Sequence, residues 1–262
     1  MMEKFVNLHN LEKAMAGFKN AVPFDHVVVD DFLAEECLEK IKDEFIGYDA
    51  PQWFSYKNQI EDKKALNDWN IFPKDTYQLF QHLNSERFVA ALSRLTGVTL
   101  HSDLGLHGGG WHIHGVGGNL NPHLDYSIHP KLGLQRKLNL IIYVSEQLEE
   151  KHGGHLGFWS NDEVARQPDK LIKEIAPKFN RAVLFDTTQN SWHGMNRPLV
   201  QPEGIYRKSL AIYYLCKPAE SADRRERALF APREEQRNNK DIEDLIRMRA
   251  DLNLSRFAYR KN

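Results

Sequence analysis

The feature that most constrains the fold is a run of short apolar segments between Val98 and about residue 218, separated by Gly, Asn and Pro turns. Segments of this length with turn residues between them are typical of β-strands. Because helical patterns come before this run, the order favours an α+β protein in which helices buttress a β sandwich. The strands are predicted at 109–116, 122–127, 136–145, 154–160, 181–187 and 206–215.

The helical patterns lie in the first third of the chain. Residues 23–32 predict a strand that leads into an amphipathic helix over 33–45, and residues 75–96 keep a helical rhythm that Gly97 closes. The aromatic-rich segment between these helices, 51–72, shows no period. It could be a loop over a site, but we expect it to be irregular and to serve packing.

The final region, 219–262, is highly charged, with the two signs interleaved. Alternating charge is typical of a solvated helix face. Four apolar residues would allow such a helix to dock on the rest of the protein: Ile242, Leu245, Ile246 and Met248.

Charge and cysteine content narrow the choice of partner and compartment. The chain has 35 basic and 36 acidic residues, so its net charge of −1 gives no electrostatic reason to expect nucleic acid or an anionic membrane. Cys37 and Cys216 lack the spacing of a thiolate metal site. No window approaches about 18 continuous apolar residues, and the N-terminus lacks the apolar core of a signal peptide. We expect a cytoplasmic protein with a small-molecule partner.

Two His-x-Asp pairs are the first candidates for a metal site. One is His123 with Asp125 in "NPHLDYS", and the other is His101 with Asp103. Residues two apart on a strand share a face, so either pair could reach one ion. Further along the chain, a strand runs out through polar residues into another histidine, His193. The second pair is followed by glycines, and we treat it as incidental.

Arg207 is the second residue of the strand predicted at 206–215, where it shares one face with Ser209, Ala211 and Tyr213. A buried guanidinium without a partner is costly, so an inward-facing arginine needs an anion. Two imidazoles and one carboxylate that leave open positions are the ligand set of non-haem iron(II). The sequence therefore predicts such a metal site at one end of a β-barrel, with Arg207 deeper inside and ready for a carboxylate.

The order of these residues resembles the iron(II)/2-oxoglutarate dioxygenases, specifically the prolyl-4-hydroxylase-like branch. The resemblance rests on His123-x-Asp125, the strand "RKLNLIIYVS", the "GGHLGFW" turn, His193 and "YRKSLAIYYL". It implies an α+β fold with a double-stranded β-helix core, of the jelly-roll or cupin-like kind, buttressed by N-terminal helices. We expect one domain over 1–262, with a helical support region over 1–97, the jelly-roll core over 98–218 and a charged helical extension over 219–262.

The resemblance also implies roles for individual residues. His123, Asp125 and His193 match the catalytic iron ligands. Arg207 matches the residue that holds the distal carboxylate of 2-oxoglutarate, a task suited to a planar, bidentate guanidinium. Tyr143 matches a second donor to that carboxylate, or is a plain core aromatic. Two further cosubstrate residues are expected on the same faces, Ser209 and Asn139. The spacing from His193 to Arg207 is longer than in many relatives, which predicts a larger loop.

The implied reaction uses Fe(II), 2-oxoglutarate and O2, with ascorbate as a stimulant. Oxidative decarboxylation of 2-oxoglutarate yields succinate and CO2, while a C–H bond of the substrate is hydroxylated. Related halogenases lack the ligand carboxylate, so the presence of Asp125 favours hydroxylation. A zinc hydrolase with the same three ligands would leave Arg207 unexplained.

The substrate pocket is predicted from polar and aromatic residues around the ligands. For His112 and His114 a polar pocket wall is favoured over a second metal site. We expect a small-molecule substrate; the alternatives are a prolyl or other peptidyl hydroxylase acting on a protein, and a non-catalytic jelly roll that binds a metal and a carboxylate. The candidate pocket residues are His112, His114, Tyr126, His129, Arg136 and Trp159.

Overall fold

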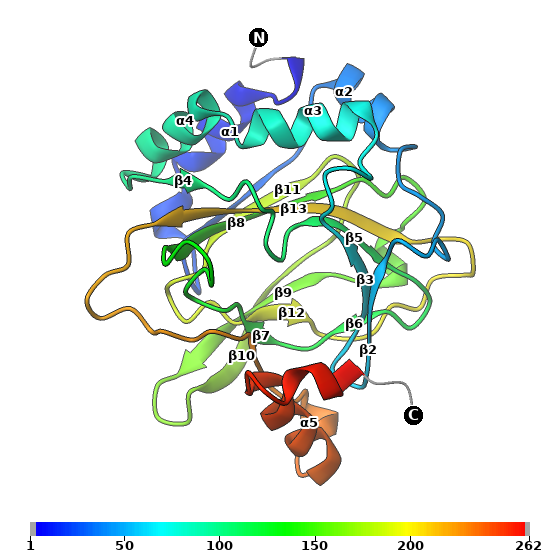
Figure 1. Cartoon of the computed structure of the whole chain (residues 1–262), viewed down its shortest axis with the longest axis vertical. Coiled ribbons are helices and arrows are strands. Elements are labelled where there is room, and N and C mark those ends of the chain that lie inside the picture. Colours follow the sequence, from blue (N-terminus) through cyan, green and yellow to red (C-terminus); the bar gives the residue numbers. More distant parts are fainter. Residues whose placement is uncertain (1–3, 260–262) are drawn as a thin grey trace.

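The computed structural model describes residues 4–259, and within them two antiparallel sheets face each other (Figure 1). The larger sheet has nine strands and the smaller has five. This is the predicted α+β arrangement with a double-stranded β-helix core. Along the larger sheet the order is β1 (His26–Val29), β11 (Ala182–Asp186), β8 (Gln135–Tyr143), β13 (Arg207–Cys216), β5 (Gly110–His114), β3 (Glu61–Leu66) and β2 (Phe54–Lys57), with β4 (His101–Ser102) beside β13 and β6 (Asn119–Leu120) beside β3.

The smaller sheet is built from the segments that carry the predicted metal ligands. Its order is β10 (Gln167–Ile175), β9 (Leu156–Asp162), β12 (His193–Met195), β7 (His123–Leu124) and β14 (Leu229–Phe230). Two of these strands, β7 and β12, are only two and three residues long. Each holds a histidine at its first residue, so the strand pairing itself sets where the two rings lie.

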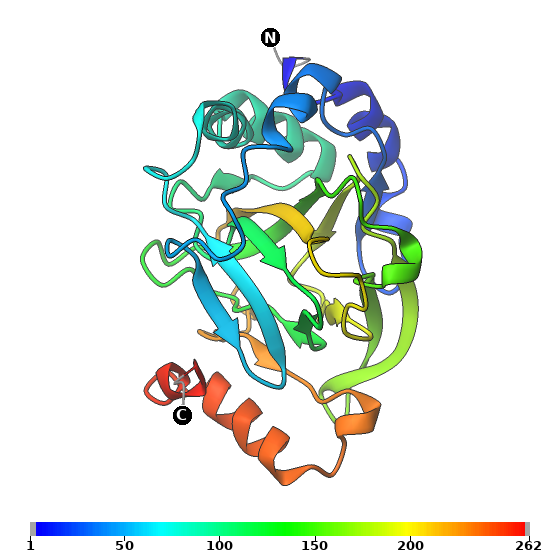
Figure 2. The same cartoon turned by 90° about the vertical axis from the view of Figure 1, so that its right-hand side faces the viewer.

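Four helices cover the outer face of the larger sheet (Figures 1 and 2). They are α1 (Leu8–Met15), α2 (Glu35–Ile41), α3 (Lys74–Leu83) and α4 (Glu86–Thr96). In the strands beneath these helices, successive side chains point to opposite faces of the sheet. On β13, Leu210 and Ile212 face the helices and belong to the main core, whereas Arg207 and Ser209 face the smaller sheet. Burying one face of the sheet under the helices leaves the other free to form a polar cavity.

The helix predicted over 75–96 is in fact two helices, which corrects that expectation. The chain leaves helical geometry at Ser85, whose backbone is extended and whose side chain accepts a hydrogen bond from the Phe88 N–H. Ser85 therefore caps α4, and a serine is a strong N-cap because it satisfies an otherwise orphaned donor. Gly97 ends α4 in the left-handed conformation (φ 74°), as the sequence predicted.

The segment 51–72 is also corrected, because it contains a β-hairpin and not an irregular packing loop. Strands β2 and β3 pair from Phe54 with Ala65 to Lys57 with Asp62, and β3 then pairs with β5. Strand β10 was likewise absent from the prediction. Most of its side chains are exposed and polar, so its sequence carries no apolar alternation.

The C-terminal region forms α5 (Lys240–Ala250), at the opposite end of the molecule from the other helices (Figure 1). Of its four predicted docking residues, Ile242, Leu245 and Ile246 pack with Ile60 and Phe230. Short 3₁₀ turns complete the chain: η2 (Phe18–Asn20), η3 (Glu150–His152), η4 (Glu234–Gln236) and η5 (Ser255–Tyr259). Within 4–259, no helix is both long and apolar enough to cross a membrane.

An ion pair fastens this region to β3. Arg249 Nε lies 2.8 Å from Glu61 Oε1, and the Tyr259 hydroxyl donates to the same carboxylate. Glu61 is 1% exposed, so its charge depends on these partners. Figure 2 shows the β2–β3 hairpin beside the C-terminal helix.

Replacing Arg249 by alanine is expected to lower the free energy of unfolding by about 3 kcal/mol, because it leaves a buried carboxylate without its cation. Urea denaturation measures this loss. Arg247→Ala on the same helix is the matched control, since the Arg247 side chain is exposed, and its loss should stay under about 0.5 kcal/mol. Equal losses in the two variants would contradict the docking role of Arg249.

Candidate active site

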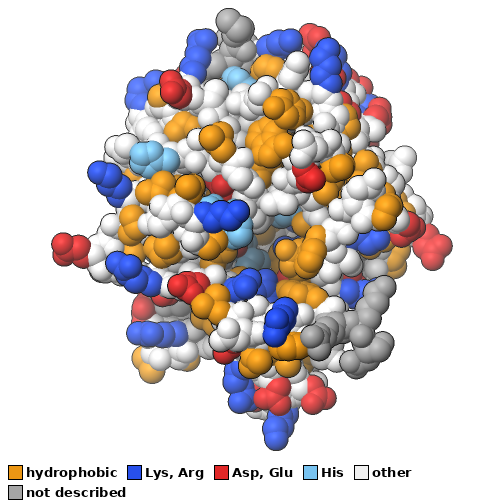
Figure 3. Space-filling view, viewed as in Figure 1, with side chains coloured by type: hydrophobic (Ala, Val, Ile, Leu, Met, Phe, Trp, Pro, Cys, Tyr) orange, Lys and Arg blue, Asp and Glu red, His pale blue; other side chains and the backbone are white. Residues whose placement is uncertain are grey.

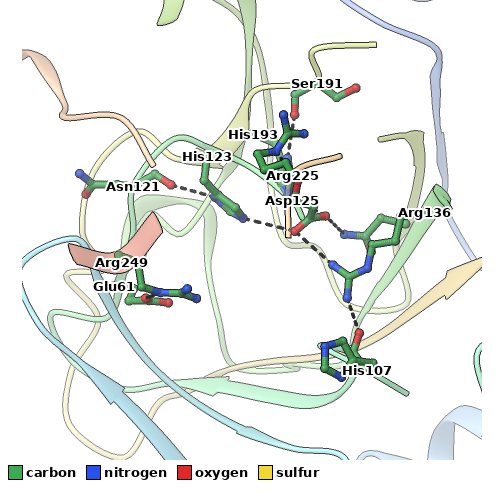
Figure 4. Close-up of polar contacts among 11 residues, drawn as sticks. Glu61, His107, Asn121, His123, Asp125, Arg136, Ser191, His193, Arg225 and Arg249 are labelled. Carbon is green, nitrogen blue, oxygen red and sulfur yellow. Dashed lines mark hydrogen bonds and ion pairs between the residues drawn. The ribbon is translucent and has the colours of Figure 1, made fainter. Parts of the chain in front are cut away.

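The three predicted ligands converge on one point of the smaller sheet (Figure 4). His123 opens β7, His193 opens β12, and the two residues are direct partners in the antiparallel register. Asp125 follows β7 and lies between the two rings, with 3.8 Å from Oδ1 to His123 Nε2 and 3.8 Å from Oδ2 to His193 Nε2. The potential ligand atoms of all three residues lie within 4.8 Å of one another.

Backbone carbonyls orient both imidazole rings. His123 Nδ1 lies 3.0 Å from the Asn121 carbonyl, and His193 Nδ1 lies 2.9 Å from the Ser191 carbonyl. A carbonyl oxygen only accepts, so each Nδ1 carries the proton and each Nε2 presents its lone pair to the cluster. Histidine ligands of metals are held in this way by a second hydrogen bond. The arrangement therefore fits a divalent metal ion.

Burial sets the protonation states that a metal ion needs. It holds the pKa of His123 well below the usual 6.5 and also lowers the pKa of His193. Burial alone would raise the pKa of Asp125, but the neighbouring His193, Arg136 and His123 bring it down to about 2. At neutral pH the site thus offers two neutral imidazoles and one carboxylate.

Arg207 lies on the opposing sheet and is 5% exposed. Its Nε donates to the Gly154 carbonyl at 2.8 Å, and its Nη2 donates to the Tyr143 hydroxyl at 3.2 Å. Both partners are neutral, and in the described part of the chain no carboxylate lies within ion-pair distance of Arg207. A buried cation without an anion is unfavourable, so the guanidinium fits a ligand carboxylate.

The other two predicted cosubstrate residues also face the interior. Ser209 is paired in register with His112 on one side and Tyr143 on the other. Asn139 donates from Nδ2 to Asp125 Oδ2 at 3.4 Å, while its Oδ1 is buried and has no partner among the described residues. Asn139 therefore orients the carboxylate and keeps one acceptor free.

Arg136 lies beside the candidate metal ligand Asp125. Its guanidinium lies between the rings of Tyr126 and Tyr213, at 3.4 and 3.5 Å from their centroids, and its Nη1 lies 3.7 Å from Asp125 Oδ1. It also donates to the His107 carbonyl. Stacking on both faces fixes the guanidinium, so Arg136 acts as a positioning residue for Asp125.

A cavity of about 400 Å³ brings these residues together between the sheets. Figure 3 shows the corresponding hollow near the centre of one face, with histidine and Lys or Arg side chains around it. Its wall includes the three predicted ligands and most of the other predicted residues: Arg207, Ser209, Asn139, His112, His114, Tyr126 and Arg136. Tyr143 is fully buried and touches Arg207.

Two predicted pocket residues are not on this wall, which corrects the expectation for them. Trp159 packs instead with Leu124 and Trp192 in a separate apolar cluster, because its position on β9 points it away from the cavity. His129 is buried in a loop, where its Nε2 lies 3.5 Å from Asp103 Oδ1. Asp103 also accepts hydrogen bonds from the backbone N–H groups of Gly105 and His107. The carboxylate of the second His-x-Asp pair, His101 with Asp103, therefore stabilises a loop.

Sequence reasoning missed a group of cavity residues outside the predicted jelly-roll core. They come from the β2–β3 hairpin and from the C-terminal region, and both segments have polar sequences. An inward-facing polar side chain breaks the apolar alternation by which strands are found. The missed residues are Phe54, Tyr56, Glu61, Lys63, Arg227, Phe230 and Arg249.

Comparison with known proteins agrees with this geometry. The family model described as the 2OG-Fe(II) oxygenase superfamily matches residues 109–215. The matched range contains the predicted core strands and all three candidate ligands, and it agrees with the predicted relationship to the iron(II)/2-oxoglutarate oxygenases.

Curated relatives share only part of their length with this chain. Prolyl 3-hydroxylase OGFOD1 of Xenopus laevis is 24% identical over 185 residues, which is 69% of this chain and 33% of that protein. The Mus musculus protein of the same name is 23% identical over 192 residues, or 68% of this chain and 30% of that protein. The chain thus spans about a third of the length of these relatives.

Solved structures with the same fold include two prolyl hydroxylases and an enzyme that binds a small molecule. A Pseudomonas putida prolyl-4-hydroxylase aligns with a TM-score of 0.55 at 14% identity, covering 79% of this chain and all of the other. A Trichoplax adhaerens prolyl hydroxylase, solved with a peptide fragment, gives 0.52 at 14% identity (78% and 89% covered). HygX of Streptomyces hygroscopicus, with nickel, 2-oxoglutarate and hygromycin B bound, gives 0.51 at 12% identity (78% and 86%). At these identities the likeness establishes the fold.

The lowered histidine pKa values predict how metal affinity depends on pH. Protons compete with the metal for Nε2, and this competition begins only below the folded-state pKa, which lies under 6.5 for both histidines. Asp125 remains ionised throughout this range. Manganese(II) affinity measured by calorimetry should therefore change by less than about twofold between pH 7.5 and 6.5. A loss of about tenfold over that interval, with the fold intact by circular dichroism, would contradict the assignment.

Proposed function

We propose that this protein is an Fe(II)/2-oxoglutarate-dependent hydroxylase in which His123, Asp125 and His193 hold the metal and Arg207 holds the cosubstrate. The observation that carries the proposal is that one cavity contains two groups that lack a partner. The first group is His123, Asp125 and His193, whose potential ligand atoms face one another. The second is the buried Arg207 guanidinium, which has only neutral hydrogen-bond partners. A non-catalytic metal site would need only the first.

Each residue then has a physical task. Arg207 binds the distal carboxylate and thereby fixes the direction in which the cosubstrate enters, and Tyr143 steadies the guanidinium through its hydroxyl. Asn139 and Arg136 hold Asp125 in place. When bound, iron and 2-oxoglutarate would supply, together with O2, the chemistry that converts a substrate C–H into C–OH, with release of succinate and CO2. Apolar side chains around the ligands limit the access of water, among them Ile141, Leu156 and Phe230.

Succinate release from 2-oxoglutarate tests the proposal directly. Protein loaded with iron(II) and ascorbate should lose turnover in His123→Ala. Arg207→Ala should raise the half-saturating 2-oxoglutarate concentration by roughly a hundredfold, because two charge-assisted hydrogen bonds are lost. Arg197→Ala is the matched control, since Arg197 is exposed and outside the cavity wall.

Two results would contradict this assignment. Turnover that survives in His123→Ala would remove the metal site from the reaction. An unchanged 2-oxoglutarate requirement in Arg207→Ala would show that another group binds the cosubstrate. If neither metal nor 2-oxoglutarate binds at all, the whole proposal fails.

The substrate remains a choice between a small molecule and a polypeptide. A near-neutral net charge and a cavity of about 400 Å³ support a small molecule, which is our first expectation. The relatives named prolyl hydroxylases, one of them solved with a peptide, support a prolyl residue in a polypeptide as the alternative. Stimulation of succinate release by free amino acids or by proline-containing peptides of about seven residues separates the two. Greater stimulation by the peptides would overturn the first expectation.

A further inference from the structure

Lys63 points into the cavity from a strand that the proposed chemistry does not use. On β3 the residues alternate, so Lys63 and Ala65 face inward, whereas Lys64 faces outward and donates to the Tyr48 carbonyl at 2.6 Å. In the register, Ala65 is opposite His112 and Lys63 is opposite Tyr56. Lys63 thus lies across the sheet from Arg207, separated from β13 by β5. Because neighbouring strands lie nearly 5 Å apart, the backbones of Lys63 and Arg207 are about 10 Å apart.

Within the described residues, Lys63 has no anion of its own. Its nearest acidic neighbours along the strand are already engaged, Glu61 with Arg249 and Asp62 with Lys57. Asp125 belongs to the metal cluster. The contact of Lys63 Nζ is with the face of Tyr56, 5.3 Å from the ring centroid. Burial lowers the pKa of Lys63, which is the direction expected for an ammonium group held away from water and lacking a partner.

Arg227 is a second cation on the cavity wall that has no ion-pair partner among the described residues. Arg227 lines the cavity just before β14, and its Nε is buried without a hydrogen-bond partner among the described residues. Tyr56 lies on the same cavity wall, and the charge of Arg227 opposes the rise in the pKa of Tyr56 that burial causes. Lys63, Tyr56 and Arg227 therefore line one cavity.

The balance of charge in the loaded cavity favours an anion. Its wall carries five basic side chains and three acidic ones, Glu61, Asp125 and Glu226. Of the five basic side chains, Arg249 pairs with Glu61 and Arg136 with Asp125, and Arg207 would pair with the cosubstrate. Lys63 and Arg227 are left without an ion-pair partner among the described residues. Two unpaired cations raise the local concentration of anions.

From these contacts we infer that the substrate carries a carboxylate or phosphate group, and that Lys63 together with Arg227 binds this group and turns the reacting carbon toward the metal. The inference rests on the proposed function, because it assumes that metal and cosubstrate occupy the other half of the cavity. It makes Lys63 a specificity-determining residue. The anionic group can belong to a small acid or to an acidic side chain of a peptide, since both present the same chemistry.

Binding to a loaded but unreactive site tests this inference. The protein is saturated with manganese(II) and N-oxalylglycine, an unreactive analogue of 2-oxoglutarate, and is titrated by ligand-observed NMR. The probes are glutarate against glutaramide, glycerol phosphate against glycerol, and an N-acetylated, C-amidated peptide Ala-Asp-Pro-Ala against the same capped peptide with Asn in place of Asp. In wild type, at least one charged probe should bind about tenfold more tightly than its neutral partner. The first two pairs represent small molecules and the third represents a peptide.

Variants of Lys63 attribute that preference to one side chain. Lys63→Gln should abolish it, and Lys63→Arg should restore it. Lys57→Gln should leave it unchanged, because Lys57 is an exposed lysine of the same hairpin outside the cavity wall. Affinity for N-oxalylglycine should stay within about twofold in Lys63→Gln, which shows both that the site is intact and that Lys63 does not bind the cosubstrate.

The outcomes separate this inference from the proposed function. Absence of any preference in wild type, or a preference that persists in Lys63→Gln, overturns the inference alone. A large loss of N-oxalylglycine affinity in Lys63→Gln would also overturn it, by assigning Lys63 to the cosubstrate. Failure of manganese(II) and N-oxalylglycine to bind wild type would overturn the proposed function and the inference with it.

Discussion

The pairing of two very short strands, β7 and β12, is the interaction on which the site depends. It sets His123 directly opposite His193, and the carbonyls of Asn121 and Ser191 then fix the tautomer of both rings. Strand β14 flanks β7 on its other side and places Phe230 against the His123 ring, with centroids 5.0 Å apart. Because the ligands are held by backbone geometry, the cluster is preorganised, with little side-chain freedom left to lose on binding.

The larger sheet forms the other wall of the cavity and contributes inward-facing cations to it. The Arg136 guanidinium stacks on two aromatic rings and lies beside Asp125, so its charge has a partner within the protein. Among the described residues, the buried Arg207 and the partly buried Lys63 contact only neutral groups. A cation withdrawn from water without compensation costs stability, and proteins retain it chiefly where a ligand provides the compensation. We therefore assign Arg136 a structural role, and we assign Arg207 and Lys63 roles in binding ligands.

The sequence was sufficient for the strand-rich core, since apolar alternation marks buried strands. It also singled out three residues that the fold brings together, His123, Asp125 and His193. It was insufficient where polar residues face inward. The hairpin that carries Lys63 has no apolar period, and β10 is mostly exposed. The break at Ser85 was hidden because apolar residues continue through it in near-helical spacing. Trp159 and His129 were misplaced because proximity in sequence to the ligands does not determine which way a side chain points.

A crystal structure of the protein with manganese(II) and 2-oxoglutarate, prepared without oxygen, tests the central claim most directly. Our account predicts one metal ion bonded to His123 Nε2, Asp125 and His193 Nε2, with the distal carboxylate of 2-oxoglutarate paired to Arg207. A metal ion bound elsewhere, or a cosubstrate carboxylate that leaves Arg207 with its neutral partners alone, would contradict it.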